Sequence, residues 1–313
     1  MVSFESLTNG DGAMTIRKSL GIPLIAVAAL LGGCASSNAE VAPQPAVEAA
    51  PVGPAPIRPA EQWLFGSAEA TILISQSYQA MTDFVVTSAK NRKTRRSVIL
   101  AERGDLFDPH FTNCDGKPSA VVFDADETLI WNVGQARWAA ENGKEFDPKI
   151  WDEWERTGEG KVVAMPGAID AVTKLRAAGI KIIANTNRDA KNAAQTAATL
   201  KTAGFGDFTH GETLFLKGDD TTGSSKDARR AVIAEKNCVI AMVGDQLGDF
   251  ANGFNDKTLT VEKRRALAVE APISHLWGKG WFLLPNPTYG PWDRAKYDDI
   301  FPANTRWEPT EGR

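Results

Sequence analysis

The sequence is poor in the side chains that bind soft metals or carry redox chemistry. Its 313 residues include three cysteines and three histidines, and no two cysteines form a Cys-x-x-Cys pair. The histidines, His110, His210 and His275, lie far apart, and none has a second ligand at the spacing of known zinc sites. The pattern argues against a zinc site, and each histidine is expected to be solvated or hydrogen-bonded.

Two further absences narrow the class of protein. The net charge is -4, with no stripe of Lys and Arg, which argues against a nucleic-acid polymer as partner. The apolar run at residues 20–31 is twelve residues long, too short to cross a bilayer as a helix. With 43% hydrophobic and 24% charged residues, the chain can bury one sizeable core, so we expect one catalytic domain with appendages.

The N-terminal segment has the order of a secretion signal. A basic pair precedes the apolar run, and Gly32-Gly33-Cys34 follows it. The small pair before Cys34 resembles a bacterial lipobox, which implies a lipoprotein signal over residues 1–34 and acylation of the Cys34 thiol. The alternative is ordinary secretory cleavage with Cys34 incidental. Because Ala35 rather than Asp follows, the resemblance implies an outer-membrane lipoprotein of the cell envelope, facing the periplasm or the cell surface.

The rest of the chain divides into a tether, a domain and a tail. Residues 35–60 are rich in Pro and Ala, and such a composition favours an extended chain over a packed core. Residues 61–292 carry the periodic patterns of a folded domain, opening with one or two helices within 61–91. Residues 293–313 form a C-terminal tail.

Within the domain, short apolar runs alternate with helical patterns. Strands are predicted at residues 119–123, 181–184, 213–216 and 238–243, and helices at 166–179, 189–203 and 224–235. The run at 119–123 is β-branched and aromatic without a polar break, which suits a strand buried on both faces. This alternation predicts an α/β fold with a doubly wound parallel sheet.

Polar residues follow three of these strands. They are Asp124 and Asp126, then Thr186 and Asn187, then Asp245 and Asp249, with Lys226 at an intervening helix start. The carboxyl ends of parallel strands meet at one edge, where open α/β sheets bind ligands. This inventory fits phosphoryl transfer, which demands charge neutralisation, an in-line nucleophile and protonation of the leaving group.

Each requirement has a candidate residue. We expect Asp124 to attack phosphorus and form an aspartyl-phosphate, and Asp126 to act in turn as general acid and base. Asp124, Asp126 and Asp245 are the expected ligands of Mg²⁺. Thr186 would hold phosphoryl oxygens, and Lys226 would neutralise charge on the nucleophile and the transferred group. Asp249 is not expected to contact the phosphate itself; we expect it to orient Lys226 or a metal-bound water. The alternative for each acid is a helix cap or a solvated loop residue.

Four motifs in this order resemble those of the haloacid dehalogenase (HAD) superfamily. They are Asp124-Ala125-Asp126-Glu127-Thr128, Thr186-Asn187-Arg188, Ser225-Lys226 and Gly244-Asp245-Gln246-Leu247-Gly248-Asp249-Phe250. More narrowly, they resemble its class C acid phosphatases, also 5'-nucleotidases, which are bacterial lipoproteins. The segment at residues 284–292 is similar to that family's C-terminal signature. Two departures are Gln246, where the family usually has Asn, and Trp131, where it often has Asp.

The resemblance implies a HAD-like fold with a small, largely helical cap, roughly residues 131–165 together with the N-terminal helices. It implies an Mg²⁺-dependent acid phosphatase for nucleoside monophosphates or similar aromatic phosphates, and it allows a homodimer. Trp151 and Tyr289 are the expected pair to sandwich an aromatic ring, with Asn187 as a phosphate-side contact. The alternatives are that both aromatic residues are core of the cap, and that Asn187 and Arg188 serve only the turn.

Two other functions fit the same sequence. One is phosphotransfer to an acceptor alcohol by the same mechanism, and the other is a non-catalytic surface-binding lipoprotein that keeps the fold. Histidine acid phosphatase chemistry is disfavoured because no Arg-His-Gly sequence occurs.

The strand order of the HAD superfamily bears on the cysteines. Its first and last motif strands are neighbours, and Cys114 and Cys238 lie at or before the N-terminal ends of those strands. We therefore expect a disulfide between them in an oxidising periplasm, at the floor opposite the active site. The alternative is two separate buried thiols.

Overall fold

A computed structural model describes residues 56–91 and 96–310. The predicted signal segment with the predicted acylation site Cys34, and all but the last residues of the predicted tether, lie outside this part of the chain. Among the described residues, no helix combines the length and the apolar character that crossing a membrane requires.

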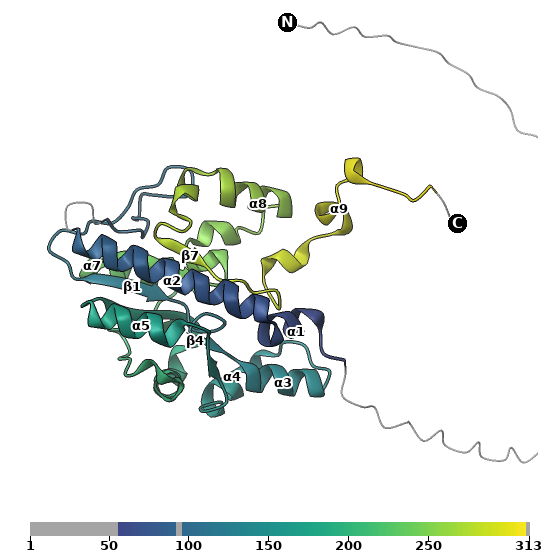
Figure 1. Cartoon of the computed structure of the whole chain (residues 1–313). Coiled ribbons are helices and arrows are strands. Elements are labelled where there is room, and N and C mark those ends of the chain that lie inside the picture. The colour runs from purple at the N-terminus through teal and green to yellow at the C-terminus, as the bar shows by residue number, and fades with distance from the viewer. Residues whose placement is uncertain (1–55, 92–95, 311–313) are drawn as a thin grey trace, which may run out of the picture. The chain divides into compact units, whose positions relative to one another are not determined.

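The centre of the domain is a five-stranded parallel sheet with the order β5-β4-β1-β6-β7 (Figure 1). Its strands are β1 (Ser119–Phe123), β4 (Lys181–Asp189), β5 (Leu214–Lys217), β6 (Cys238–Gly244) and β7 (Trp281–Leu283). Every residue of β1 is buried, as expected for a central strand covered on both faces. The predicted doubly wound α/β fold is therefore confirmed.

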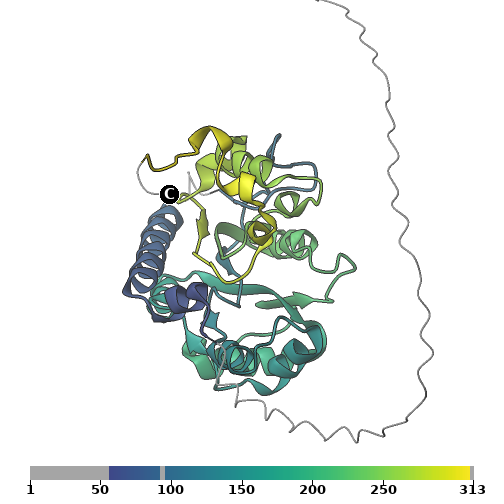
Figure 2. The ribbon, with the colours of Figure 1, turned by 90° about the vertical axis from the view of Figure 1, so that its right-hand side faces the viewer.

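Helices cover both faces of this sheet, as Figures 1 and 2 show. The helices are α1 (Pro59–Gly66), α2 (Ala68–Lys90), α3 (Val133–Glu141), α4 (Pro148–Thr157), α5 (Ala168–Ala177), α6 (Ala193–Leu200), α7 (Asp227–Lys236), α8 (Val261–Glu270) and α9 (Tyr297–Ile300). Val121 and Phe123 of β1 pack in the core that α2 and α5 complete, whereas Ala120 and Val122 pack in the core that α7 and α8 complete. The alternation of side chains along β1 thus divides the core into two layers.

Short helical turns complete the chain. They are 3-10 helices at Ala190–Asn192, Leu247–Asp249, Asn252–Asn255, Pro272–Leu276, Pro291–Arg294 and Ala303–Thr305, and a π-helical turn at Lys201–Phe205.

The cap is an insertion between β1 and α5 that enters and leaves through two short antiparallel strands. They are β2 (Ile130–Trp131) and β3 (Val163–Ala164), and α3 and α4 lie between them. The buried carboxylate of Glu155, on α4, accepts hydrogen bonds from the Asp189 backbone and from Asn192, each 2.9 Å long. The cap is therefore fixed to the end of β4.

Some element boundaries differ from the predictions. The strand predicted at residues 181–184 continues to Asp189, because its second half pairs with β5 through Asp189 and Lys217. The predicted start of the next helix, at residue 189, was therefore wrong. The helix predicted from residue 224 begins at Asp227, directly after Lys226. Strand β7 and helix α8 were not predicted.

A disulfide joins Cys114 to Cys238 and confirms the expected pairing. Cys238 is the first residue of β6, and Asp245 follows the last residue of that strand. At about 3.3 Å per residue, the disulfide lies about 20 Å from the carboxylates at the other end of the sheet.

Loss of this disulfide is expected to lower stability without changing the active site. It closes a loop with a sequence separation of 124, and bridges of this kind typically contribute about 2–4 kcal/mol. Denaturant unfolding of a Cys114→Ala/Cys238→Ala variant measures this difference. An unchanged midpoint, or a several-fold change in kcat, would contradict the assignment of a purely structural role.

Candidate active site

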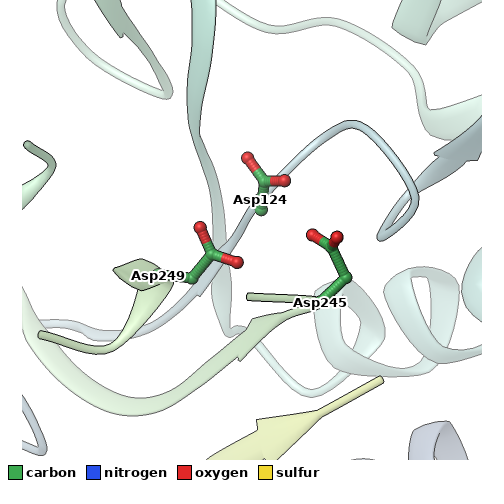
Figure 3. Close-up of side chains that lie close together, drawn as sticks. All are labelled: Asp124, Asp245 and Asp249. Atoms are coloured by element: carbon green, nitrogen blue, oxygen red, sulfur yellow. The ribbon is translucent and has the colours of Figure 1, made fainter. Parts of the chain in front are cut away.

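Three neighbouring parallel strands end at one edge and bring the predicted polar residues together. Asp124 follows β1, Thr186 lies in β4 and Asp245 follows β6, and β1 is hydrogen-bonded to both other strands. Such an edge is where open α/β sheets bind ligands. Figure 3 shows the carboxylates of Asp124, Asp245 and Asp249 gathered at this edge.

These three carboxylates form a cluster that suits a hard divalent cation. One oxygen from each lies within 4.8 Å of the others, and Asp124 and Asp245 are buried. Mg²⁺ is commonly held in proteins by one or two carboxylates together with waters. Burial raises the pKa of Asp124 well above its usual value and outweighs the opposing effect of Lys226. Burial and the nearby Asp249 raise the pKa of Asp245 to about 7. A cation among these acids would offset both effects.

Lys226 links the expected nucleophile to the outer acid of the cluster. Its Nζ donates to Asp124 Oδ1 and, over 2.7 Å, to Asp249 Oδ1. Burial lowers the pKa of Lys226, but the carboxylates of Asp124 and Asp249 more than offset this effect, so its pKa is raised. Lys226 therefore stays cationic beside Asp124, and Asp249 accepts its second hydrogen bond.

Asp126 lies apart from the carboxylate cluster and has its own cation. Arg188 donates to Asp126 Oδ1 through Nη2 over 2.7 Å and through Nε over 2.9 Å. Asn132 Nδ2 donates to the same oxygen over 2.9 Å, whereas the contacts of Oδ2 are longer, 3.2 Å to Arg188 Nε and 3.5 Å to the Thr186 hydroxyl. Oδ2 is thus the more open oxygen of Asp126.

Arg188 is a site residue for which sequence reasoning offered the alternative of a role in the turn only. It is 1% exposed and pairs with Asp126 across the sheet edge, which argues against that alternative. Its position two residues after Thr186, on the same side of an extended strand, is a signal that could have placed it at the site.

Helix α7 places two further arginines that the sequence pattern did not single out. Arg229 donates to the Thr186 carbonyl and to Asn187 Oδ1, and Arg230 donates to the carbonyls of Gly248 and Asp249. Both guanidinium groups are buried. The start of α7, with Lys226, Arg229 and Arg230, therefore connects the ends of β1 and β4 to the turn after β6.

Thr186 and Asn187 differ in their surroundings. Thr186 is fully buried, and its hydroxyl accepts from the Arg188 backbone over 3.2 Å. Asn187 is exposed, and its amide donates to the Ser224 carbonyl over 3.1 Å. With Arg229 on its other amide atom, Asn187 is tied to the loop before α7.

The two expected aromatic residues contact different residues of the site: Tyr289 contacts the turn after β1, and Trp151 lies beside Arg188 of β4. The Tyr289 hydroxyl donates to Glu127 over 2.7 Å, while 44% of the residue remains exposed. The ring of Trp151, on α4, lies 5.9 Å from the guanidinium carbon of Arg188. Trp151 is partly buried, so neither ring is simply core of the cap.

The buried acids predict an unusual pH dependence for the metal-free protein. Burial raises the pKa of Glu127, and likewise that of Asp245, to about 7, from 4.5 and 3.8. The folded state therefore holds protons that the unfolded chain releases near pH 4, so these groups stabilise the fold at low pH. Their contribution is lost as the pH rises to about 7, at up to about 1.4 kcal/mol per pH unit and group.

We therefore expect a lower Tm in EDTA at pH 7.5 than at pH 5, and recovery at pH 7.5 when Mg²⁺ is added. An Asp245→Asn variant, which has no such proton to lose, should show a smaller fall in Tm. A Tm in EDTA that rises between pH 5 and pH 7.5 would contradict this expectation.

Comparison with known proteins identifies the family of the chain. The model of a family described as HAD superfamily, subfamily IIIB (acid phosphatase) matches residues 40–292. The stem 31 kDa glycoprotein of Glycine max is 26% identical over 173 residues, which cover 54% of this chain and 58% of the relative. Acid phosphatase 1 of Solanum lycopersicum is 26% identical over 133 residues, 41% of this chain and 50% of the relative. The chain thus spans about half the length of these curated relatives.

Solved structures agree on the fold. The class C acid phosphatase from Bacillus anthracis matches with a TM-score of 0.60 at 24% identity, over 77% of this chain and 86% of that one. The same enzyme solved with tungstate bound matches with a TM-score of 0.60 at 25% identity, over 78% and 89%.

Proposed function

Because this chain belongs to the acid phosphatases of HAD subfamily IIIB, we propose that it hydrolyses phosphate monoesters through an aspartyl-phosphate on Asp124, with Mg²⁺ as cofactor. The observation that carries this proposal is the buried carboxylate of Asp124, which contacts Lys226 and lies within 4.8 Å of oxygens of Asp245 and Asp249. A nucleophile, a fixed cation and a cation-binding cluster thus meet at one point.

The residues present fit a divalent cation. Asp124 and Asp245 would hold it, and Asp249 is the third acid of the cluster. The Asp126 carboxylate, expected as a further ligand, lies outside this cluster and is held by Arg188 and Asn132. Bound Mg²⁺ would supply positive charge that lets a carboxylate approach a phosphate dianion.

The chain's own residues account for the remaining steps. Asp124 would form a bond to phosphorus as the bond to the ester oxygen breaks, and Asp126 would give that oxygen its proton. Asp126 would then take a proton from the water that attacks the phosphoenzyme, which releases phosphate and frees Asp124. Lys226 and the Thr186 hydroxyl would stabilise the charge that develops on the transferred group.

Arg188 and Asn132 would hold Asp126 so that its more open oxygen faces the leaving group. An Arg188→Gln variant is therefore expected to lose about 100-fold in kcat/KM for an alkyl phosphate, within the usual contribution of general acid catalysis. For p-nitrophenyl phosphate, whose leaving group needs no proton, the loss should stay below about tenfold. Equal losses for both esters would show that Arg188 does not act through Asp126, and Arg188→Lys serves as the charge-preserving control.

The expected substrates are nucleoside monophosphates or similar aromatic phosphates. The exposed residue Tyr289 contacts Glu127, and the cap residue Trp151 lies beside Arg188, the partner of Asp126. Ring stacking is worth about 1–3 kcal/mol per base. The related Bacillus anthracis enzyme was solved with tungstate, which like phosphate is a tetrahedral oxyanion.

A panel of phosphate esters, assayed in EDTA and again after addition of Mg²⁺, tests this function. We expect turnover only with Mg²⁺, and higher kcat/KM for aromatic esters than for small alkyl esters. Phosphorylated alcohol in place of free phosphate, after addition of an acceptor alcohol, would identify a phosphotransferase. Absence of turnover across the panel would favour a non-catalytic surface lipoprotein.

We also propose the cell envelope as the location, with an acyl chain on Cys34 as anchor. The disulfide between Cys114 and Cys238 supports an oxidising compartment. Labelled palmitate should appear in the full chain and be absent from a Cys34→Ser variant. Equal labelling of both would count against the anchor.

A further inference from the structure

The two oxygens of the metal-ligand candidate Asp245 have different partners. Oδ2 accepts from Asn286 Nδ2 over 2.7 Å and from Gln246 Nε2 over 2.9 Å. Oδ1 has one contact, to the Thr128 hydroxyl at 3.5 Å. Two amides thus fix the orientation of the carboxylate and leave Oδ1 open to a cation.

Both amides also hold the segment that follows β7, which we call the closing segment (residues 284–290). Asn286 belongs to it, and its Oδ1 accepts from the backbone and the hydroxyl of Thr288 over 2.9 Å and 2.6 Å. Gln246 Nε2 donates to the Tyr289 carbonyl over 3.0 Å in addition to Asp245. The closing segment is therefore anchored at two points on one carboxylate oxygen.

Gln246 packs tightly enough against the closing segment to explain a glycine there. A Cβ atom on Gly290 would lie 2.7 Å from Gln246 Oε1 and 2.5 Å from Trp292 Nε1. Contacts this short do not occur between real side chains, so Gly290 permits the close approach. The position of Gln246 thus determines where the backbone of Tyr289 runs.

The far end of the closing segment reaches the turn after β1. The Tyr289 hydroxyl donates to Glu127, whose carboxylate also accepts from the Asn132 backbone and side chain. The segment therefore connects the metal-ligand candidate Asp245 to the turn that carries Asp126, and Tyr289 remains 44% exposed.

Resting on the proposed phosphatase function, we propose that Gln246 and Asn286 are positioning residues that couple cation binding at Asp245 to the placement of Tyr289 for an aromatic substrate. Occupation of Oδ1 by a cation fixes the carboxylate, and Oδ2 then fixes the closing segment through the two amides. Coupling of this kind is reciprocal: an aromatic ligand against Tyr289 tightens cation binding by the factor by which the cation tightens ligand binding.

Calorimetric titration of Mg²⁺ into the metal-free full chain, with and without saturating adenosine, tests this coupling without turnover. Adenosine carries an aromatic ring and no phosphate, so it reports on the aromatic contacts and not on the phosphate contacts. In the wild type, adenosine is expected to lower the Kd for Mg²⁺ by about fivefold or more. In Gln246→Ala and in Asn286→Ala, the Kd for Mg²⁺ should rise by about 10–100-fold, and the effect of adenosine should fall below about twofold.

Two variants make the comparison specific. Gln246→Asn shortens the side chain by one methylene, about 1.5 Å, so the amide can keep only one of its two partners. This variant should still fold but should lose most of the adenosine effect. Gln79→Ala removes the same groups from an exposed position on α2 and should behave as the wild type.

The proposal would be overturned by a wild-type Kd for Mg²⁺ that adenosine leaves unchanged. It would also be overturned if Gln246→Ala and Asn286→Ala bound Mg²⁺ with a Kd within about twofold of the wild type, or if Gln246→Asn showed the full adenosine effect. Failure of the phosphatase assay with the coupling intact would instead refute the proposed function, because the titration measures binding alone.

Discussion

Replacement of Asp124 by Asn is expected to lower kcat by about 10⁴-fold or more, the scale seen when a catalytic nucleophile is removed. The amide nitrogen and oxygen fill the same space as the carboxylate but cannot form an acyl-phosphate. The substitution also removes one negative charge from a cluster in which Asp124, Asp245 and Asp249 lie within 4.8 Å. The fold should therefore survive, since Lys226 keeps Asp249 as partner. Steady-state kinetics at saturating Mg²⁺ measure the loss.

Two comparisons separate loss of chemistry from loss of structure. The variant should unfold at a temperature close to that of the wild type, and an Asp83→Asn variant on the exposed face of α2 should retain full activity. Residual activity of the Asp124 variant within about tenfold of the wild type corresponds to only about 1.4 kcal/mol of transition-state stabilisation. Such a result would contradict covalent catalysis by this residue.

Replacement of Lys226 by Met is expected to damage both activity and stability. Lys226 is 4% exposed and donates to Asp124 and Asp249, so its loss leaves the buried Asp124 and the partly buried Asp249 without their shared cation. Removal of one partner from a buried ion pair typically costs about 3–5 kcal/mol. Loss of a preorganised charge at the reacting group typically costs about 10²–10³-fold in kcat. Denaturant unfolding and steady-state kinetics measure the two effects.

A second substitution distinguishes the electrostatic cause from simple misfolding. Addition of Asp249→Asn to the Lys226→Met variant removes one unpaired charge and should restore part of the stability, but not the activity. The exposed Lys144, on the cap, offers a matched Lys→Met control with no expected effect. Full activity of the Lys226 variant, or no recovery of stability in the double variant, would contradict the role given to this lysine.

The local sequence was sufficient for the parts of the fold that depend on local signals. The strand predicted at residues 119–123 has the same bounds as β1, because an uninterrupted β-branched and aromatic run suits a central parallel strand. The acids after that strand and after β6 were found because parallel strands place their carboxyl ends at one edge.

The site residues that were missed depend on contacts distant in sequence. Arg188 pairs with Asp126 across 62 residues, and Arg229 reaches the Thr186 carbonyl across 43. Nothing in the neighbouring sequence separates such a buried arginine from a solvated one, because long-range pairing determines its burial. The same holds for β4, whose polar second half extends the strand because Asp189 pairs with Lys217 of β5.

The most direct test of the central claim is to identify the residue that carries the phosphoryl group. Enzyme quenched in acid during turnover and reduced with borohydride should contain homoserine at position 124, because this reagent reduces an aspartyl-phosphate to the alcohol. Peptide mass spectrometry detects the conversion of Asp124 to homoserine by comparison with enzyme that was not exposed to substrate. We predict homoserine at position 124 in the substrate-treated sample alone. Absence of homoserine from enzyme that is turning over, or homoserine at another residue, would contradict covalent catalysis by Asp124.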